Sequence, residues 1–270
     1  VILTLADGTK NEVADESTST VKGAIYSDSD LTINGKGSLT VNGAASNAIK
    51  SKDGIRIVDA TVTTTAKKHG IAANDFVNVS GATLNLSADE DGIHSDNEDD
   101  VLLGNIYLVD TTITVNAGDD GINASNTMLI DEGATIDVQK SEEGLEARLI
   151  DQAGDVKIVI DGGTLTVDAE GDGLDANGSI EINGGTVVVN GPTSGANAAL
   201  DYDDNATLNG GTVLFVDNGQ MTMGFGSDSS QAFLMASVQG TAGTTVEVVD
   251  SSGKTVASSK ASKSFSTVLI

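Results

Sequence analysis

The stretch Gly162-Gly163-Thr164-Leu165-Thr166-Val167, followed by Gly171-Asp172-Gly173-Leu174-Asp175-Ala176, contains the two phrases that decide the fold of this chain. The first phrase is a glycine turn that leads into an alternating strand, and the second is an acid followed by Gly and Leu. Both phrases recur along the chain every 22 to 29 residues. A period of this length is typical of solenoids and other repeat architectures, so it governs how the remaining sequence is interpreted.

Two columns of residues follow this period independently. The apolar column, which usually follows the glycine, contains Ile25, Ile49, Ile71, Ile93, Ile122, Leu145, Leu174 and Leu200. The threonine column after the turn contains Thr61, Thr83, Thr112, Thr135, Thr164, Thr186 and Thr212. Because both columns keep the same spacing, equivalent residues of successive repeats are expected to stack on one another.

Each repeat contains three short β patterns, which in one unit are residues 158–160, 164–167 and 173–176. Alternation at period two points the apolar side chains inward, namely Ile158, Ile160, Leu165, Val167 and Leu174. Three short strands in about 22 residues predict an all-β fold, a parallel β-helix of about eight coils that lie about 4.8 Å apart. A propeller blade would need four strands in about 40 residues, and no segment has a helical period.

Two coils are longer than the others, because the spacings from Ile93 to Ile122 and from Leu145 to Leu174 are 29 residues. The extra residues fall near 97–104 and 148–154. We expect them to form loops on the same side of the solenoid.

The two ends of a solenoid need covers. Residues 1 to about 22 are the first candidate cap, so the β-helix with its N-terminal cap is expected to span residues 1–220. The period is then lost, and residues 221–270 predict a C-terminal antiparallel β cap around a turn at Ser252-Gly253. The chain begins within an apolar strand pattern, from which we expect a mature or trimmed chain.

Composition narrows the class of protein. The 270 residues include no Cys and carry a net charge of −26, so phosphates would be repelled and nucleic acid is not an expected partner. No apolar run is long enough to span a bilayer. Gly is abundant with 32 residues, which fits short strands joined by tight turns.

Stacking also aligns acidic residues into what we call the carboxylate ladder, which has two lines. The line two positions before the apolar column contains His69, Asp91, Asp120, Glu143 and Asp172. The line one position after it contains His94, Asn123, Glu146, Asp175 and Asp201. Like charges stacked about 5 Å apart repel by about 3 kcal/mol per pair at an effective dielectric near 20, so the ladder needs a counter-charge.

A hard divalent cation supplies that counter-charge best, and Ca²⁺ prefers six to eight oxygen ligands. Thiols are absent and histidines are two, so Zn²⁺ is disfavoured. The candidate ligands are Asp89 and Asp91, which form one possible site, and Asp119, Asp120, Asn123, Glu142, Glu143, Glu146, Asp172, Asp175 and Asp201. The alternative is a solvated acidic face, which we expect for the loop acids Asp96, Glu98, Asp99 and Asp100.

Basic and aromatic residues are sparse. Lys50, Lys52, Arg56, Lys67 and Lys68 lie in two early coils, which suits either an anionic sugar bridged by calcium or ordinary solubility. The candidate substrate-binding residues are Lys140 and Arg148 near the acids, with Tyr107 and Tyr202 as stacking side chains.

The opening Lys22-Gly23-Ala24-Ile25-Tyr26-Ser27, the repeated Asp-Gly-Ile and Gly-Gly-Thr phrases, and the tail Met223-Gly224-Phe225 resemble a family of bacterial cell-surface β-helix proteins of clostridial type with carbohydrate-binding domains. The resemblance covers nearly the whole chain. It implies a right-handed parallel β-helix, bound Ca²⁺, export to the bacterial surface, and binding of plant cell-wall polysaccharide such as cellulose or acidic pectic sugars.

That family is in turn similar to family 9 pectate lyases, which carry calcium-binding acids at i, i+1 and i+4 and a lysine base. Two stretches match this spacing, namely Glu142, Glu143 and Glu146 and, less fully, Asp119, Asp120 and Asn123. Lys140 and Lys157 are the available lysines, but neither stands in a recognisable lyase motif.

We therefore predict a secreted, monomeric, calcium-binding module that binds polysaccharide without catalysis. A calcium-dependent polysaccharide lyase and a structural adhesin or stalk are the alternatives.

Overall fold

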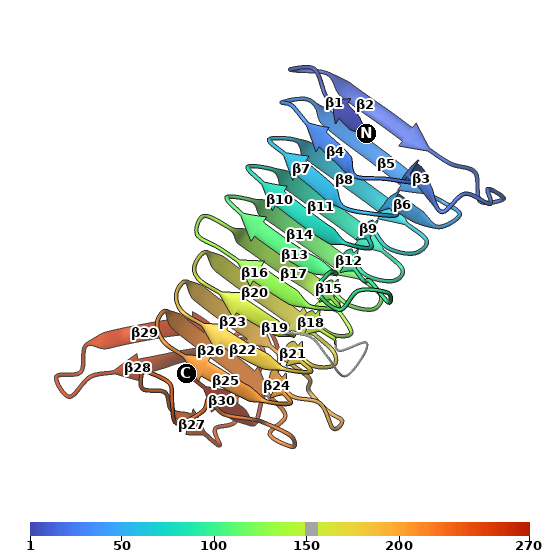
Figure 1. The fold of residues 1–270 in the computed structure, drawn as a ribbon. Helices are drawn as coiled ribbons and strands as arrows, with labels where there is room; N and C mark the ends of the chain where they lie inside the picture. The colour runs from blue at the N-terminus through green and yellow to red at the C-terminus, as the bar shows by residue number, and fades with distance from the viewer. Residues whose placement is uncertain (149–155) are drawn as a thin grey trace.

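A computed structural model describes residues 1–148 and 156–270 of the chain. The described residues form β-strands joined by turns and loops, without an α-helix. Three parallel sheets wrap around one elongated core, and each coil contributes one strand to each sheet (Figure 1). The predicted all-β parallel solenoid of about eight coils is confirmed.

We name the sheets A, B and C. Sheet A contains β1 (Ile2–Thr4), β4 (Leu31–Asn34), β7 (Ile55–Val58), β10 (Phe76–Ser80), β13 (Asn105–Val109), β16 (Thr127–Ile130), β19 (Lys157–Ile160), β22 (Ser179–Ile182) and β25 (Asn205–Leu208). Sheet C contains β3 (Gly23–Ser27), β6 (Asn47–Ser51), β9 (Ile71–Ala73), β12 (Ile93–Ser95), β15 (Ile122–Ala124), β18 (Leu145–Ala147), β21 (Leu174–Ala176) and β24 (Leu200–Tyr202).

Sheet B is the longest. It contains β2 (Lys10–Ala14), β5 (Ser38–Gly43), β8 (Thr61–Ala66), β11 (Thr83–Ala88), β14 (Thr112–Ala117), β17 (Thr135–Ser141), β20 (Thr164–Ala169), β23 (Thr186–Asn190), β26 (Thr212–Asp217), β30 (Thr267–Leu269) and β27 (Met235–Ala236). The predicted threonine column opens its strands, and each Thr pairs in register with the Thr of the next coil.

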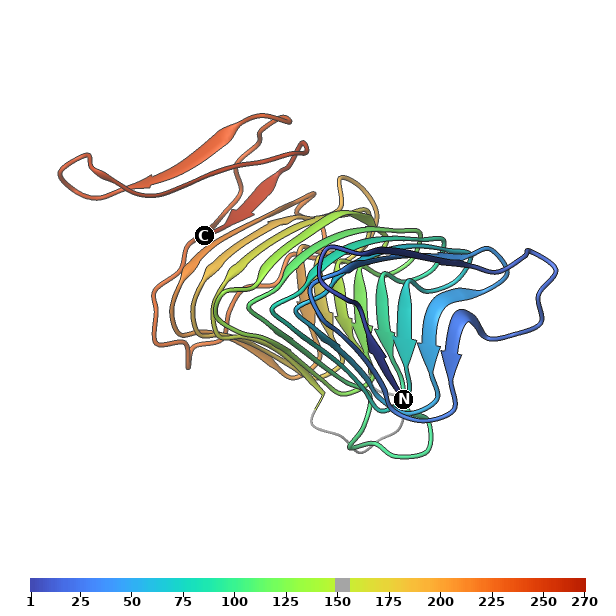
Figure 2. The same ribbon diagram turned by 90° about the horizontal axis from the view of Figure 1, so that it is seen from above.

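The core lies inside the three sheets, as the view along the axis shows (Figure 2). All five side chains predicted to point inward in the unit around residue 165 are at most 1% exposed. The apolar column runs in register through sheet C, where Ile122 pairs with Ile93 on one side and Leu145 on the other. Each coil therefore buries equivalent apolar side chains against its neighbours, which stabilises the stack by the hydrophobic effect.

The glycine turns are required by close approach of successive coils. Gly163 has a φ of 78°, which L-residues with a Cβ rarely adopt. A Cβ on Gly163 would also lie 2.4 Å from the backbone oxygen of Ala134 in the preceding coil. The Gly-Gly-Thr phrase is thus a steric condition for stacking.

The two ends of the solenoid are closed differently. β1 and β2 pair in parallel with β4 and β5, so the N-terminal segment is itself a partial coil. At the other end β30 pairs antiparallel with β26, and β28 (Thr245–Val249) forms an antiparallel hairpin with β29 (Thr255–Lys260). The antiparallel β structure predicted for residues 221–270 is confirmed.

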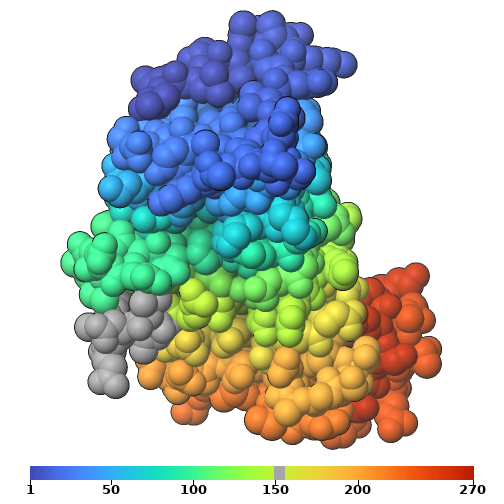
Figure 3. All heavy atoms as spheres, turned by 90° about the vertical axis from the view of Figure 1, so that its right-hand side faces the viewer, coloured from blue at the N-terminus to red at the C-terminus, as the bar shows by residue number. Residues whose placement is uncertain are grey.

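The first long loop protrudes from the side of the solenoid, where the green segment around residue 100 stands out in Figure 3. The second predicted loop, near residues 148–154, lies outside the described residues except for Arg148. Within the described chain, no helix has the length and apolar character to cross a bilayer.

Candidate metal and ligand site

The carboxylate ladder forms as the spacing predicts. Along its second line, Asn123 pairs with His94 and Glu146, and Asp175 pairs with Glu146 and Asp201 in the adjacent strands of sheet C. Along its first line, the turn glycines tie the coils together, because Gly92 N–H donates to Asp120 O and Gly121 N–H donates to Glu143 O. Equivalent polar side chains are therefore held on one face, one coil apart.

The N-terminal half of the ladder is built around the buried Asp91. The Oδ2 atom of Asp91 lies 2.6 Å from Nδ1 of His94 and 3.2 Å from Nδ1 of His69. Burial opposes ionisation of Asp91, yet the hydrogen bonds from His69 and His94 hold its pKa well below the usual range. Burial would lower the pKa of His94, but its hydrogen bonds to Asp91 and Asp96 raise that pKa to about 9. His94 is therefore an imidazolium at neutral pH.

Other acids of this half also have cationic partners. Lys67 forms an ion pair of 2.5 Å with Asp89, and Lys68 lies 3.6 Å from Glu90. Arg148 reaches back from the end of β18 to Asp96 at 3.2 Å. The protein neutralises this part of the ladder with its own side chains.

The C-terminal half contains the same kind of stack without such partners. Among the described residues, no Lys, Arg or His forms an ion pair with an acid of this group, namely Asp119, Asp120, Glu142, Glu143, Glu146, Asp172, Asp175 and Asp201. At its centre, Asn123 Nδ2 donates to both Asp120 Oδ2 and Glu146 Oε2. The Oδ1 atom of Asn123 is buried and has no hydrogen-bond partner. A buried acceptor without a partner costs free energy, so this oxygen would gain from a ligand.

Three carboxyl groups in the C-terminal half have raised pKa values, which reflect the same lack of nearby positive charge. Burial, hydrogen bonding to Asp120 and the charge of Asp120 raise the pKa of Glu143 to about 8. Burial and the charge of Asp120 raise the pKa of Glu146 to about 8. Burial and the charges of Asp172 and Asp201 raise the pKa of Asp175 to about 7. These carboxyl groups hold protons at a pH where isolated carboxyls are ionised, so a bound cation would replace those protons.

The donor chemistry fits calcium. The centre of the C-terminal half offers carboxylate oxygens and the amide oxygen Asn123 Oδ1, which is the all-oxygen set that Ca²⁺ prefers. Carboxylate oxygens of Asp91, Asp119 and Asp120 also lie within 4.8 Å of one another, where the two halves meet.

The histidine cluster fits a metal less well. One ligand atom each of His69, Asp91 and His94 also lies within 4.8 Å of the others. The two rings, however, stack at a centroid distance of 4.3 Å and an angle of 10°. A metal binds an imidazole nitrogen in the plane of its ring, and two parallel stacked rings share no such plane. The stack suits hydrogen bonding to Asp91.

The other predicted site residues are spread over the molecule. Asp89 is engaged by Lys67, whereas Lys140 lies at a β-bulge of β17 and lines a cavity of about 330 Å³ with Glu142. Tyr107 is 39% exposed on sheet A, one sheet away from the ladder. Tyr202 directly follows Asp201, the last residue of the ladder line, but its hydroxyl donates to Gly224 O at 2.7 Å and so connects β24 to the C-terminal region.

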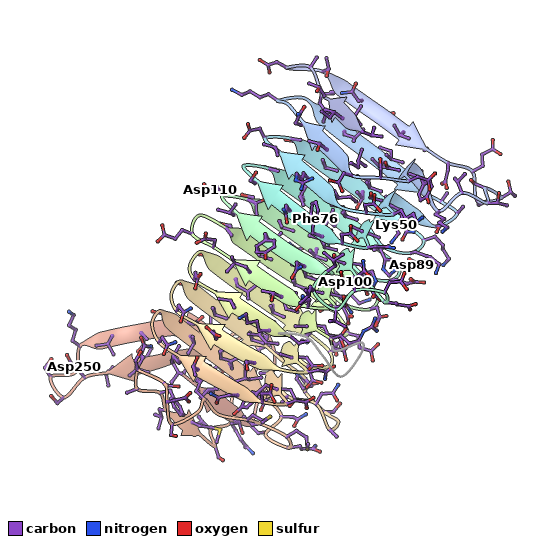
Figure 4. The ribbon with its side chains drawn as sticks, viewed as in Figure 1. Lys50, Phe76, Asp89, Asp100, Asp110 and Asp250 are labelled. Atoms are coloured by element: carbon purple, nitrogen blue, oxygen red, sulfur yellow. The ribbon has the colours of Figure 1, made fainter. Side chains whose placement is uncertain are left out.

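Lys50 is a residue that the predicted site left out. It stands on the second ladder line, in register with Ala72 and, one coil further, His94. The rule that aligned the acids, one position after the apolar column, also aligns Lys50 behind Ile49. In Figure 4 Lys50, Asp89 and Asp100 lie on the same flank of the solenoid, whereas Asp110 lies at the opposite edge.

A parallel solenoid with an acidic line of side chains along one face defines a class of protein, a β-helix with a carboxylate ladder on its side. Within that class, the chain belongs to the family of carbohydrate-binding domain-containing proteins, whose family model matches residues 1–195 and 150–270. The carbohydrate binding implied by the sequence resemblance is supported by this membership. Comparisons with curated proteins and with solved structures find no match.

Proposed function

We propose that this chain is a non-catalytic module that binds Ca²⁺ in the C-terminal half of its carboxylate ladder and recognises plant cell-wall polysaccharide there, at the bacterial surface. The observation that supports it best is Asn123 Oδ1, a buried oxygen without a partner, whose carboxylate neighbours form no ion pair within the described residues. A bound Ca²⁺ would satisfy both deficits at once.

The residues that would hold calcium fall into two groups. Asp120 and Glu146 both accept from Asn123 Nδ2, and Glu143 interacts with Asp120 by hydrogen bonding and with Glu146 by charge repulsion. Asp172, Asp175 and Asp201 form a second group, in which Asp172 is already oriented by the N–H of Ala198 at 2.6 Å. Calcium bound at an exposed acidic face retains open positions for sugar hydroxyl or carboxylate oxygens. Extracellular modules bind calcium with Kd of about 0.1–1 mM, which suits a surface protein.

The test is calcium titration of the metal-free chain by calorimetry, followed by retention on cellulose and polygalacturonate with and without EDTA. We expect measurable calcium binding and retention on at least one polysaccharide that weakens in EDTA. Absence of calcium binding would contradict the metal site. Calcium binding without retention on either polymer would favour the stalk or adhesin alternative.

The lyase alternative needs a base beside the metal. Lys157 lies in β19 on sheet A, away from the ladder, and Lys140 lies at the β17 bulge near Glu142. Neither arrangement places a lysine beside Asn123 among the contacts of the described residues. Incubation with polygalacturonate and calcium should therefore give no ultraviolet absorbance from unsaturated product. Turnover that is lost in a Lys140→Met or Lys157→Met variant would overturn the binding-only proposal.

A further inference from the structure

A polar cavity lies beside the ladder, outside the proposed calcium groups. Its volume is about 430 Å³. Lys50 and His94 border it from the ladder line, with the short Ala72 side chain between them in register. The protruding loop around Asp99 closes its other side. Pockets of about 300–1,000 Å³ are the size that holds small organic ligands.

The cavity is held open by fixed contacts. Asn97 Nδ2 donates to Asp75 Oδ1 at 2.8 Å, and the backbone N–H groups of Asp99 and Asp100 donate to Asn97 Oδ1. Asp96 is anchored by Arg148. The loop is therefore preorganised, which reduces the entropy lost when a ligand binds.

Lys50 supplies unused donors. Its Nζ donates to Asn74 Oδ1 at 2.6 Å, and no carboxylate of residues 1–148 and 156–270 lies within ion-pair distance of it. Burial lowers the pKa of Lys50, and the charge of Asp96 opposes that shift. An ammonium group has three N–H donors, so two remain for a ligand.

The same cavity supplies unused acceptors. The Oδ1 atom of Asp96 is buried and has no hydrogen-bond partner. Six carboxylates line the cavity, against the cations Lys50, Lys52 and His94. This excess of negative charge would repel a uronate. Carboxylate acceptors beside ammonium and amide donors match the hydroxyl groups of an uncharged sugar, each of which donates and accepts.

We propose that the cavity between Lys50, Asn74 and Asp96 is a calcium-independent subsite for a neutral sugar unit of a polysaccharide. The inference rests on the polysaccharide binding proposed above, and it assigns neutral and acidic sugar units to different positions along the ladder. Neutral units bind in the Lys50 cavity, and calcium with any acidic unit binds near Asn123, one coil beyond His94.

The test uses calorimetry of the whole chain in EDTA with cellohexaose, mannohexaose and xylohexaose, and with hexagalacturonate as the acidic probe. We expect at least one neutral hexasaccharide to bind in EDTA and hexagalacturonate not to bind. Lys50→Met keeps the aliphatic stem but removes the donors. It should weaken neutral binding by about tenfold or more, the usual effect of losing a hydrogen bond to a charged group. Lys36→Met, an exposed lysine outside the cavity, is the matched control.

Lys52→Met tests the same cavity if the Lys50 variant does not fold. Lys52 is exposed at the cavity wall, and its loss should weaken neutral binding to a smaller extent. Unchanged neutral binding in Lys50→Met would overturn the subsite while leaving the proposed function standing. Hexagalacturonate binding in EDTA that disappears in Lys50→Met would overturn the neutral assignment. A wild-type chain that binds none of the neutral probes would also refute the subsite, and failure to bind any polysaccharide with calcium would refute the proposed function itself.

Discussion

The two halves of the carboxylate ladder occupy equivalent positions of the same repeat, yet they balance their charge in opposite ways. Around Asp91 the chain provides its own partners, since the His94 imidazolium and the His69 ring both contact one buried carboxylate. Around Glu146 the chain provides an amide and more carboxylates. A buried charge is tolerated only when it is paired, so the first half is balanced as folded, whereas the second half would gain from a cation bound from solution. The repeat fixes where side chains stand, and the residue type at each position decides what they bind.

The largest expected effect is that of calcium on stability. At free calcium of about 10 mM, roughly 100-fold above a Kd of about 0.1 mM, each occupied group should raise the free energy of unfolding by about 2.7 kcal/mol, so the two proposed groups together should raise it by about 5 kcal/mol. That corresponds to a Tm increase on the order of 10 °C, since each kcal/mol shifts Tm by about 2–4 °C in chains of this size. Differential scanning calorimetry with calcium and with EDTA measures it. Identical Tm values would mean that both halves are balanced without metal.

The next largest effect should come from Asp91→Ala. This substitution leaves the His94 imidazolium buried without its main partner, which should destabilise the fold by about 3 kcal/mol. The loss should be the same in calcium and in EDTA, and the calcium-induced rise in Tm should persist. If that rise disappears, Asp91 is a calcium ligand and the proposed boundary between the halves is wrong.

A smaller effect, with opposite signs in the two conditions, is expected for the double variant Glu143→Gln with Glu146→Gln. Neutral amides remove the free-energy cost of protonating these two groups beside Asp120 on folding, so the Tm in EDTA should rise by a few degrees. The same change removes calcium ligands, so the Tm in calcium should fall below that of the parent chain. Both values come from thermal unfolding.

Glu181→Gln, the same change at an outward position of β22 on sheet A, provides the matched control and should alter neither value. A double variant that keeps the full calcium response would show that the metal binds elsewhere on the ladder.

The last expected effect is the pH dependence of the metal-free chain. Glu143 and Glu146 have folded pKa values of about 8, against 4.5 for an unperturbed Glu. The folded state therefore binds more protons than the unfolded state between these values, so stability in EDTA should fall as pH rises from about 4.5 to 8. Calcium should abolish this decline because it displaces the protons. A Tm in EDTA that stays level from pH 5 to 8 would contradict the unbalanced half.

The fold was predictable because the repeat period of the sequence determines how the coils stack. The apolar and threonine columns gave the register of sheets B and C, and that register alone placed Asn123 beside Glu146. The sheet and the contacts of single residues outside these columns were harder to predict from the sequence. The spacing does not show that Tyr107 belongs to sheet A, or that Tyr202 is held by Gly224.

The charge balance of the site was the hardest property to predict from the sequence. The pairing of Asp91 with His94 depends on how the chain folds back after the turn glycine, which a linear pattern does not describe. The bulge at Lys140 adds one residue within β17 and leaves little trace in a period that already varies. The place of Lys50 on the second ladder line was predictable from the sequence, because Lys50 directly follows Ile49 of the apolar column.

The direction of the hydrogen bonds has a mechanical consequence. In every sheet the bonds between coils run along the solenoid axis, and the first coil and β30 lie at opposite ends of the stack (Figure 1). Tension along that axis would load the coils one after another, since each coil contacts only its neighbours. The solenoid should therefore yield in small successive steps. Calcium shared between the coils of Asp120, Glu146 and Asp175 would act as a clasp across the middle of the series, where extension should pause.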